Sequence, residues 1–202
     1  MLILTSLLLA EGLHAQDRPA GQANKQVLAD FLIEWMQVRY PAAPSEGIVL
    51  YVSARHQRMY LVVDGTMMAE YAISTARNGL GALRGSQQTP EGLHRVARKF
   101  GDDVPPLGIL KYRQYTGAVA KADQGQDDLI TSRILWLDGL EPGTNAGGDV
   151  DSHERCIYIH GTAEEATIGT PSSHGCIRMR NQDVIGLYDQ VPLGTLVMIL
   201  DN

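Results

Sequence analysis

The spacing of hydrophobic residues changes near residue 45, and this change constrains the fold more than any other feature of the chain. In residues 24–40 (NKQVLADFLIEWMQVRY) apolar side chains recur at helical spacing, and Pro41 ends the pattern. Beyond it, short apolar runs such as IVLYVS (48–53) and RMYLVV (58–63) are separated by turn formers. The 21 Gly and 9 Pro residues suit such turns better than a helical bundle. The sequence therefore predicts a helix followed by a mostly β domain.

The β pattern continues to the end of the chain. Further strands are expected at residues 67–75, 92–96, 129–137, 156–160 and 195–200. Residues 138–155 have no apolar periodicity and many turn formers, so we expect a long loop there. Residues 181–191 carry apolar side chains on one helical face, and Pro192 ends that helix. The expected fold class is mostly β, of the α+β type, with mixed sheets and peripheral helices.

Length and charge limit the number of domains and the kinds of partner. With 202 residues, 44% of them hydrophobic, the chain is long enough for one well-buried core. Its net charge is −6, whereas nucleic-acid binding relies on Lys and Arg that neutralise phosphates. We therefore expect one main domain and no nucleic-acid partner.

The first residues are typical of an export signal. Residues 1–15 hold an apolar run, Leu2 to Ala10, followed by Leu-His-Ala at the point where a signal peptidase would cut. We expect a cleaved signal peptide here and no transmembrane segment after its removal, which places the protein in the periplasm or cell envelope. No Lys or Arg precedes the apolar run, so a cytoplasmic location stays an alternative. Residues 16–45 are then a helical segment with a linker, and residues 46–202 form the main domain.

Cys176 stands in PSSHGCIRMR (171–180), whose composition suits a reactive thiol better than a buried structural one. A thiol reacts as the thiolate, so it needs a base or a positive neighbour. His174 is two residues away, and His160 ends an expected strand. The amides of Gly175 and Cys176 are candidates for an oxyanion hole. These residue types together predict nucleophilic catalysis by Cys176.

The order of these residues resembles the YkuD-type L,D-transpeptidase catalytic domain. The family hallmark is an isolated His, a spacer, and a Ser/Thr-His-Gly-Cys run followed by a hydrophobic residue and Arg or Asn. Here fifteen residues separate His160 from Cys176, and SHGCIR (173–178) matches the run. TPEGLHRV (89–96) is similar to the family's Thr-Pro-x-Gly segment, so the resemblance covers about residues 46–201. It implies an L,D-transpeptidase-like β-sandwich of mixed sheets.

The resemblance also implies roles for individual residues. Cys176 corresponds to the nucleophile and His160 to its base, while Arg178 is similar to a residue that holds a substrate carboxylate. The expected site-lining residues are Ser173, His174, Gly175, Gly161 and Thr162, with Tyr158 as an apolar wall for the substrate. Gly161 stands where some family members have Ser directly after the first His, so the group that orients His160 is either a backbone carbonyl or Thr162.

Family members act on the peptide stems of peptidoglycan and need no cofactor. The implied reaction is attack by Cys176 on the third residue of a tetrapeptide donor, release of D-alanine, and transfer of the acyl group to an amine acceptor. With water as acceptor, the same site would make an L,D-carboxypeptidase. The expected partners are therefore peptidoglycan stems, and no oligomeric state is predicted.

Two other classes of function are weighed against the enzyme. Zinc ligand types occur at His153, Cys156, His160, His174 and Cys176, but their spacing fits no zinc motif, so we expect no metal. A non-catalytic module that binds the cell wall is disfavoured because both His160 and Cys176 are present. A disulfide between Cys156 and Cys176 is disfavoured because the residues around Cys176 suit a reactive thiol better than a disulfide.

Overall fold

The computed structural model describes residues 20–44, 46–125 and 128–202, which fall into two compact units divided between Ala43 and Pro44. The first unit contains helix α1 (Ala20–Arg39), in which Trp35 packs edge-on against Tyr40 just past the helix end. The helix expected at residues 24–40 is thus present and begins earlier. The signal peptide expected at residues 1–15 lies outside the described residues.

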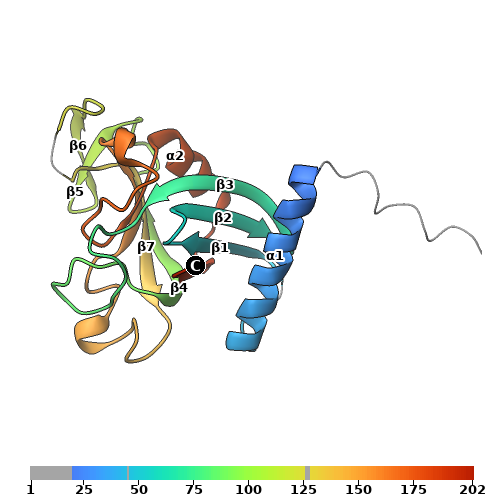
Figure 1. Ribbon diagram of the computed structural model, residues 1–202. Helices are drawn as coiled ribbons and strands as arrows, with labels where there is room; N and C mark the ends of the chain where they lie inside the picture. Colours follow the sequence, from blue (N-terminus) through green and yellow to red (C-terminus); the bar gives the residue numbers. More distant parts are fainter. Residues whose placement is uncertain (1–19, 45, 126–127) are drawn as a thin grey trace, which may run out of the picture. The chain divides into compact units, whose positions relative to one another are not determined.

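The second unit consists of ten strands and one α-helix (Figure 1). The first half contains β1 (Ile48–Ser53), β2 (Arg58–Val63), β3 (Thr66–Ser74), β4 (Gly92–Phe100), β5 (Gly108–Lys111) and β6 (Gln114–Val119). The second half contains β7 (Ile130–Gly139), β8 (Tyr158–Thr162), β9 (Ile177–Met179), α2 (Asn181–Gln190) and β10 (Leu196–Leu200).

All ten strands belong to one mixed sheet in the order β4-β10-β1-β2-β3-β9-β8-β7-β5-β6. The β1–β10 and β8–β9 pairs are parallel, and the others are antiparallel. β4 also pairs with β7, so the sheet closes on itself and leaves the β5–β6 hairpin outside the closed part. The expected mostly β fold with mixed pairing and helices at its periphery is confirmed.

The main core lies between the inner face of this curled sheet and α2. Val184 and Leu187 of α2 are fully buried at helical spacing against Leu135, Ile159 and other strand residues. The helix ends at Gln190 because Pro192 cannot continue it. The core anchors β7 and β8, which carry much of the functional site.

A second, smaller cluster lies beside the main core. Its buried members are Val104, Leu110, Ile134, Trp136 and Tyr158, and both cysteines pack against it. Since side chains alternate along a strand, Ile157 and Ile159 face the main core, whereas Tyr158 and His160 face the opposite way. His160, the candidate base, is therefore on the face of β8 that points away from the main core.

The hairpin β5–β6 is an element that we did not predict from the sequence. Its connection, Tyr112-Arg113, has none of the Gly, Asn or Asp residues that mark two-residue hairpin loops. Every residue of β6 is exposed, so its sequence lacks the alternation of a half-buried strand. The signal that could have revealed it is the pair of β-type runs GILK and QYTGAV on either side of two residues.

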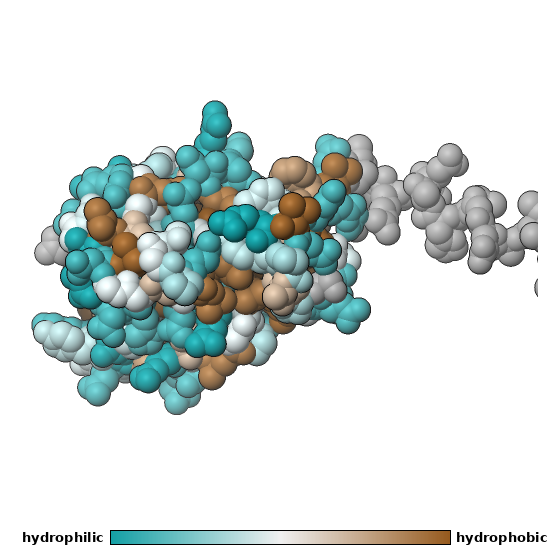
Figure 2. Space-filling view, turned by 90° about the horizontal axis from the view of Figure 1, so that it is seen from below, coloured by the Kyte–Doolittle hydropathy of each residue, from teal (hydrophilic) through white to brown (hydrophobic). Residues whose placement is uncertain are grey.

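Large exposed hydrophobic side chains of the second unit include Met68 on β3, Leu193 after α2, and Tyr112, Tyr115 and Val119 of the β5–β6 hairpin. On the face shown in Figure 2, hydrophobic residues lie among hydrophilic ones. Neither helix of the described part of the chain combines the length and apolar character needed to cross a lipid bilayer.

His94 on β4 makes the stability of the fold depend on pH. Its ring is buried and contacts the carbonyl oxygen of Gly92 and the hydroxyl of Ser152, both at 3.0 Å. Burial lowers the pKa of His94 from 6.5 to about 4. Below pH 6.5 the unfolded chain therefore binds a proton that the folded chain excludes, and stability is lost as pH falls towards 4.

We expect His94→Gln, which can keep both hydrogen bonds, to remove this loss. Between pH 7 and 4.5 the wild-type free energy of unfolding should fall by about 2–3 kcal/mol more than that of the variant. Urea unfolding at both pH values measures the difference. Parallel losses in the two proteins would show that His94 is not the source.

Candidate active site

The register of β8 and β9 brings the two expected catalytic residues to one place. The strands are parallel, with His160 opposite Arg178 and Ile159 opposite Ile177. Cys176 immediately precedes β9 and lies beside Tyr158, whose backbone N–H donates to its Sγ at 3.4 Å. Cys176 and Arg178 therefore share a face with Tyr158 and His160, because side chains two positions apart point to the same side of a sheet.

The thiol of Cys176 is protonated and only partly exposed in the resting protein. Its Sγ donates to the carbonyl oxygen of Cys156 at 3.4 Å. Burial is the largest effect on its pKa and raises it to about 12, with a smaller upward contribution from the Asp128 carboxylate. The backbone N–H of Tyr158 and the charge of Arg178 act in the opposite direction, because both favour the thiolate. A base is thus required to ionise this thiol.

The ring of His160 has the tautomer that such a base needs. Its Nδ1 lies 2.7 Å from the backbone carbonyl oxygen of Gly161, which can only accept a hydrogen bond. Nδ1 therefore carries the proton, and Nε2 of the neutral ring is free to accept one. The ring is buried, which lowers the pKa of His160 and keeps it neutral at pH 7. Of the two alternatives for orienting His160, the structure has the backbone carbonyl.

Thr162, the other alternative, is engaged elsewhere, since its hydroxyl accepts the N–H of Glu164 at 3.1 Å. Gly161 is required by space: a Cβ here would lie 2.7 Å from the carbonyl oxygen of Thr131 and 2.8 Å from Oδ1 of Asn181. Asn181, a residue that we did not single out from the sequence, also donates to the carbonyl oxygen of Thr162 at 2.8 Å. It therefore fills the space beside Gly161, whose carbonyl orients His160.

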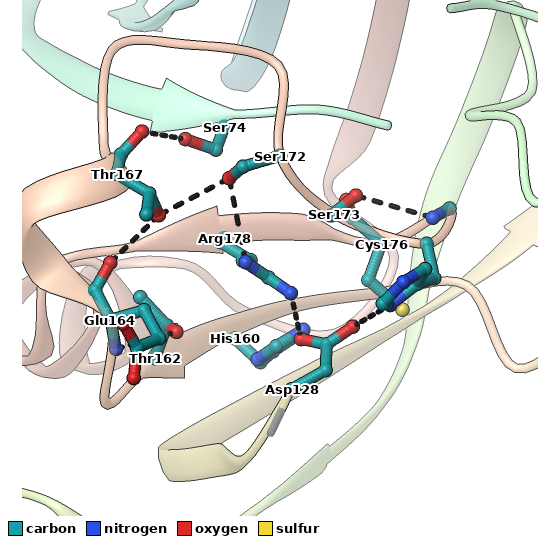
Figure 3. A network of polar contacts seen from close by, with 12 residues as sticks. Ser74, Asp128, His160, Thr162, Glu164, Thr167, Ser172, Ser173, Cys176 and Arg178 are labelled. Carbon is teal, nitrogen blue, oxygen red and sulfur yellow. Dashed lines mark hydrogen bonds and ion pairs between the residues drawn. The ribbon is translucent and has the colours of Figure 1, made fainter. Parts of the chain in front are cut away.

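Asp128 joins two of the expected site residues and was also missed in the sequence (Figure 3). One carboxylate oxygen contacts Nδ1 of His174 at 2.7 Å, and the other is ion-paired with the guanidinium of Arg178. Arg178 is buried and also donates to Ser172 at 3.4 Å. Asp128 precedes β7 in a polar segment where nothing in the local sequence distinguishes it from a solvated acid.

The Asp128 carboxylate raises the pKa of both His160 and Cys176, and the Arg178 guanidinium lowers both. The negative charge of Asp128 raises the pKa of His160, which stabilises the imidazolium that forms. The positive charge of Arg178 lowers the pKa of Cys176, which stabilises the thiolate. Among the described residues no hydrogen bond joins Cys176 to His160 in this resting arrangement, in which the thiol proton points to Cys156.

The turn before Cys176 is shaped by Ser173 and Gly175. The hydroxyl of Ser173 accepts the Gly175 N–H at 3.2 Å and donates to the carbonyl oxygen of Cys176 at 2.5 Å. Gly175 has a φ of 132°, which a residue with a side chain rarely adopts. Thr89 of the TPEG segment holds the same turn, since its hydroxyl donates to the carbonyl oxygen of Gly175 at 2.9 Å. In the resting state the Gly175 amide, one of the two expected oxyanion donors, is thus bonded within the turn.

The sequence of the second unit matches a known family. The model of the L,D-transpeptidase catalytic domain (YkuD) matches residues 47–199. The chain belongs to this family.

Curated relatives of this L,D-transpeptidase domain are similar over most of the chain. "Probable L,D-transpeptidase ErfK/SrfK" of Salmonella typhimurium is 51% identical over 176 residues, which cover 85% of this chain and 49% of the relative. The Bacillus subtilis protein YqjB is 44% identical over 118 residues, or 55% of this chain and 61% of its own length. The chain therefore spans about half to three-fifths of the length of these relatives.

Solved structures of the family also align with the chain. The crystal structure of the L,D-transpeptidase from Xylanimonas cellulosilytica has a TM-score of 0.47 at 19% identity, and it covers 77% of this chain and 61% of that chain. The L,D-transpeptidase 3 of Mycobacterium tuberculosis, in complex with a faropenem-derived adduct, has a TM-score of 0.48 at 16% identity. That alignment covers 76% of this chain and 60% of that chain.

Tyr158 and Trp136 belong to the small hydrophobic cluster against which Cys176 packs. Their rings meet edge to face with centroids 5.5 Å apart. The Tyr158 hydroxyl accepts a hydrogen bond from the guanidinium of Arg113 at 3.2 Å. Arg113 comes from the β5–β6 hairpin, so an element missed in the sequence reaches the edge of the site.

The residue types that could bind zinc have other partners. His153 contacts Asp138 at 2.6 Å and stacks on Trp136, while His174 contacts Asp128. Within the described residues, no group of at least three His, Cys, Asp or Glu side chains could hold a metal ion. Cys156 and Cys176 are both free thiols.

Proposed function

We propose that this protein is a peptidoglycan L,D-transpeptidase that works through a thioester at Cys176. The observation that carries the proposal is the position of Cys176 on the same sheet face as His160, whose Nδ1 is bonded to a backbone carbonyl so that Nε2 is its basic atom. The family membership supports the substrate class, which is the peptide stem of peptidoglycan.

The proposed reaction proceeds in two steps. His160 takes the thiol proton as Sγ attacks the carbonyl carbon of the third stem residue, and the same proton goes to the amine of the departing D-alanine as the C–N bond breaks. An amine of a second stem then attacks the thioester, the C–S bond breaks, and Cys176 regains its proton through His160. We further propose that the enzyme acts outside the cytoplasm, where polymeric wall offers amine acceptors.

The test is mass spectrometry of the full chain after incubation with a disaccharide-tetrapeptide. A dimer linked between two third-position residues, with release of D-alanine, is the expected product. A tripeptide with free D-alanine and no dimer would replace the transpeptidase by an L,D-carboxypeptidase with water as acceptor. No product of either kind would contradict the proposed function.

A further inference from the structure

Arg113 occupies a backbone conformation that its side-chain contacts must stabilise. Lys111 pairs with Gln114, so Tyr112 and Arg113 form a two-residue hairpin loop with φ values of 52° and 65°. Loops of this kind favour Asn-Gly, because residues with a Cβ are strained at positive φ. Tyr112 is 81% exposed, so the packing of its side chain offsets little of that strain. The unusual loop sequence is explained by what Arg113 contacts.

Those contacts bring the guanidinium of Arg113 to the edge of the active site. Its Nη1 donates to the Tyr158 hydroxyl at 3.2 Å, and its Cζ lies 4.6 Å from the centre of the Trp136 ring. Tyr158 in turn donates its backbone N–H to the Sγ of Cys176. Tyr158 alone therefore separates the guanidinium of Arg113 from the Sγ of Cys176. The contacts with Tyr158 and Trp136 fix the position of the guanidinium.

The guanidinium of Arg113 has no carboxylate partner among the described residues. Four others have a carboxylate partner, namely Arg58, Arg84, Arg95 and Arg178. Among the described residues, no carboxylate pairs with Arg113 or with Arg98, whose Cζ lies 5.9 Å from the same Trp136 ring. Two guanidinium groups without a carboxylate partner thus lie near one aromatic ring, where they attract an anion.

Arg178, by contrast, is already neutralised. Its guanidinium is buried and ion-paired with Asp128. A substrate carboxylate would have to displace Asp128 before it could bind there, whereas Arg113 has free donors and is partly exposed.

We infer that Arg113, held by Tyr158 and Trp136, binds a carboxylate of the acyl-donor stem and so determines which stems this enzyme accepts. The inference rests on the proposed function and deepens it, because it names the chemical group that the site recognises. Arg113 makes no contact with the reacting thiol, so it should act mainly through KM and leave kcat nearly unchanged.

The experiment compares tetrapeptide stems in which each carboxylate in turn is replaced by a carboxamide. For the wild-type full chain, one of these replacements should lower kcat/KM by roughly 10- to 100-fold, the value of a hydrogen-bonded charge. Arg113→Met, which keeps the length of the side chain without its charge, should react equally slowly with both forms of that stem. Arg84→Met, at an exposed ion pair, should behave like the wild type.

A preference that persists in Arg113→Met, or the absence of any preference in the wild type, would overturn the inference. Calorimetric titration of Cys176→Ala with the same stems separates this result from failure of the proposed function. Suppose that the wild type turns over no stem, but that Cys176→Ala binds one carboxylate stem better than its carboxamide. If the double variant Cys176→Ala, Arg113→Met loses that preference, the inference holds and only the proposed reaction fails.

Discussion

Replacement of Cys176 by Ala should lower turnover of a tetrapeptide stem by at least about 10⁴-fold, because no other group can form the thioester. The fold should be unaffected, since within the described part of the chain the Sγ makes only two long hydrogen bonds of 3.4 Å, to Tyr158 and Cys156. Mass spectrometry of the incubated stem measures turnover, and the intact mass of the wild-type protein after brief incubation should show the acyl adduct.

Cys156→Ala is the matched control for Cys176→Ala. The backbone carbonyl of Cys156 accepts a hydrogen bond from the Cys176 thiol, and the substitution retains this carbonyl. Turnover should therefore stay within about threefold of the wild type, as expected for a change at a non-reacting side chain. Activity retained in Cys176→Ala, or lost equally in both variants, would contradict Cys176 as the nucleophile.

Replacement of His160 by Gln should lower kcat/KM by about 10²- to 10⁴-fold, because the thiol then has no base. Gln has a similar length to His but no basic nitrogen, so the proton acceptor at the position of Nε2 is lost. His56→Gln, at the β1–β2 turn, is the control and should keep full activity. Equal activity in the two variants would exclude His160 as the base.

The pH dependence of the wild-type enzyme gives a second measure of the role of His160. Burial lowers the pKa of His160, the Asp128 charge partly offsets this, and Arg178 acts with burial. The ring is thus neutral at pH 6.5 and above, and kcat/KM should fall only as pH drops through a pKa below 6.5. The Cys176 thiol, with a pKa of about 12, should add no rise between pH 7 and 9. An acid limb above pH 6.5 would contradict this protonation scheme.

The sequence was most informative where local pattern and tertiary structure agree. Buried strands such as β1 and β10 have continuous apolar runs, and α2 has apolar residues at helical spacing, so their positions could be predicted. The hairpin β5–β6 could not, because its exposed residues carry no pattern and its loop is held by Trp136 and Tyr158, which are distant in sequence.

The sequence by itself determined the family and predicted the nucleophile and its base, since these depend on residue types in a fixed order along neighbouring strands. Only the tertiary structure decided which group orients His160, that Asp128 neutralises Arg178, and that Arg113 reaches the site. The physical reason is that a hydrogen bond or an ion pair depends on the positions of two atoms within a few tenths of an ångström. Such positions are fixed by the pairing of strands far apart in the chain, and no local pattern of residues encodes them.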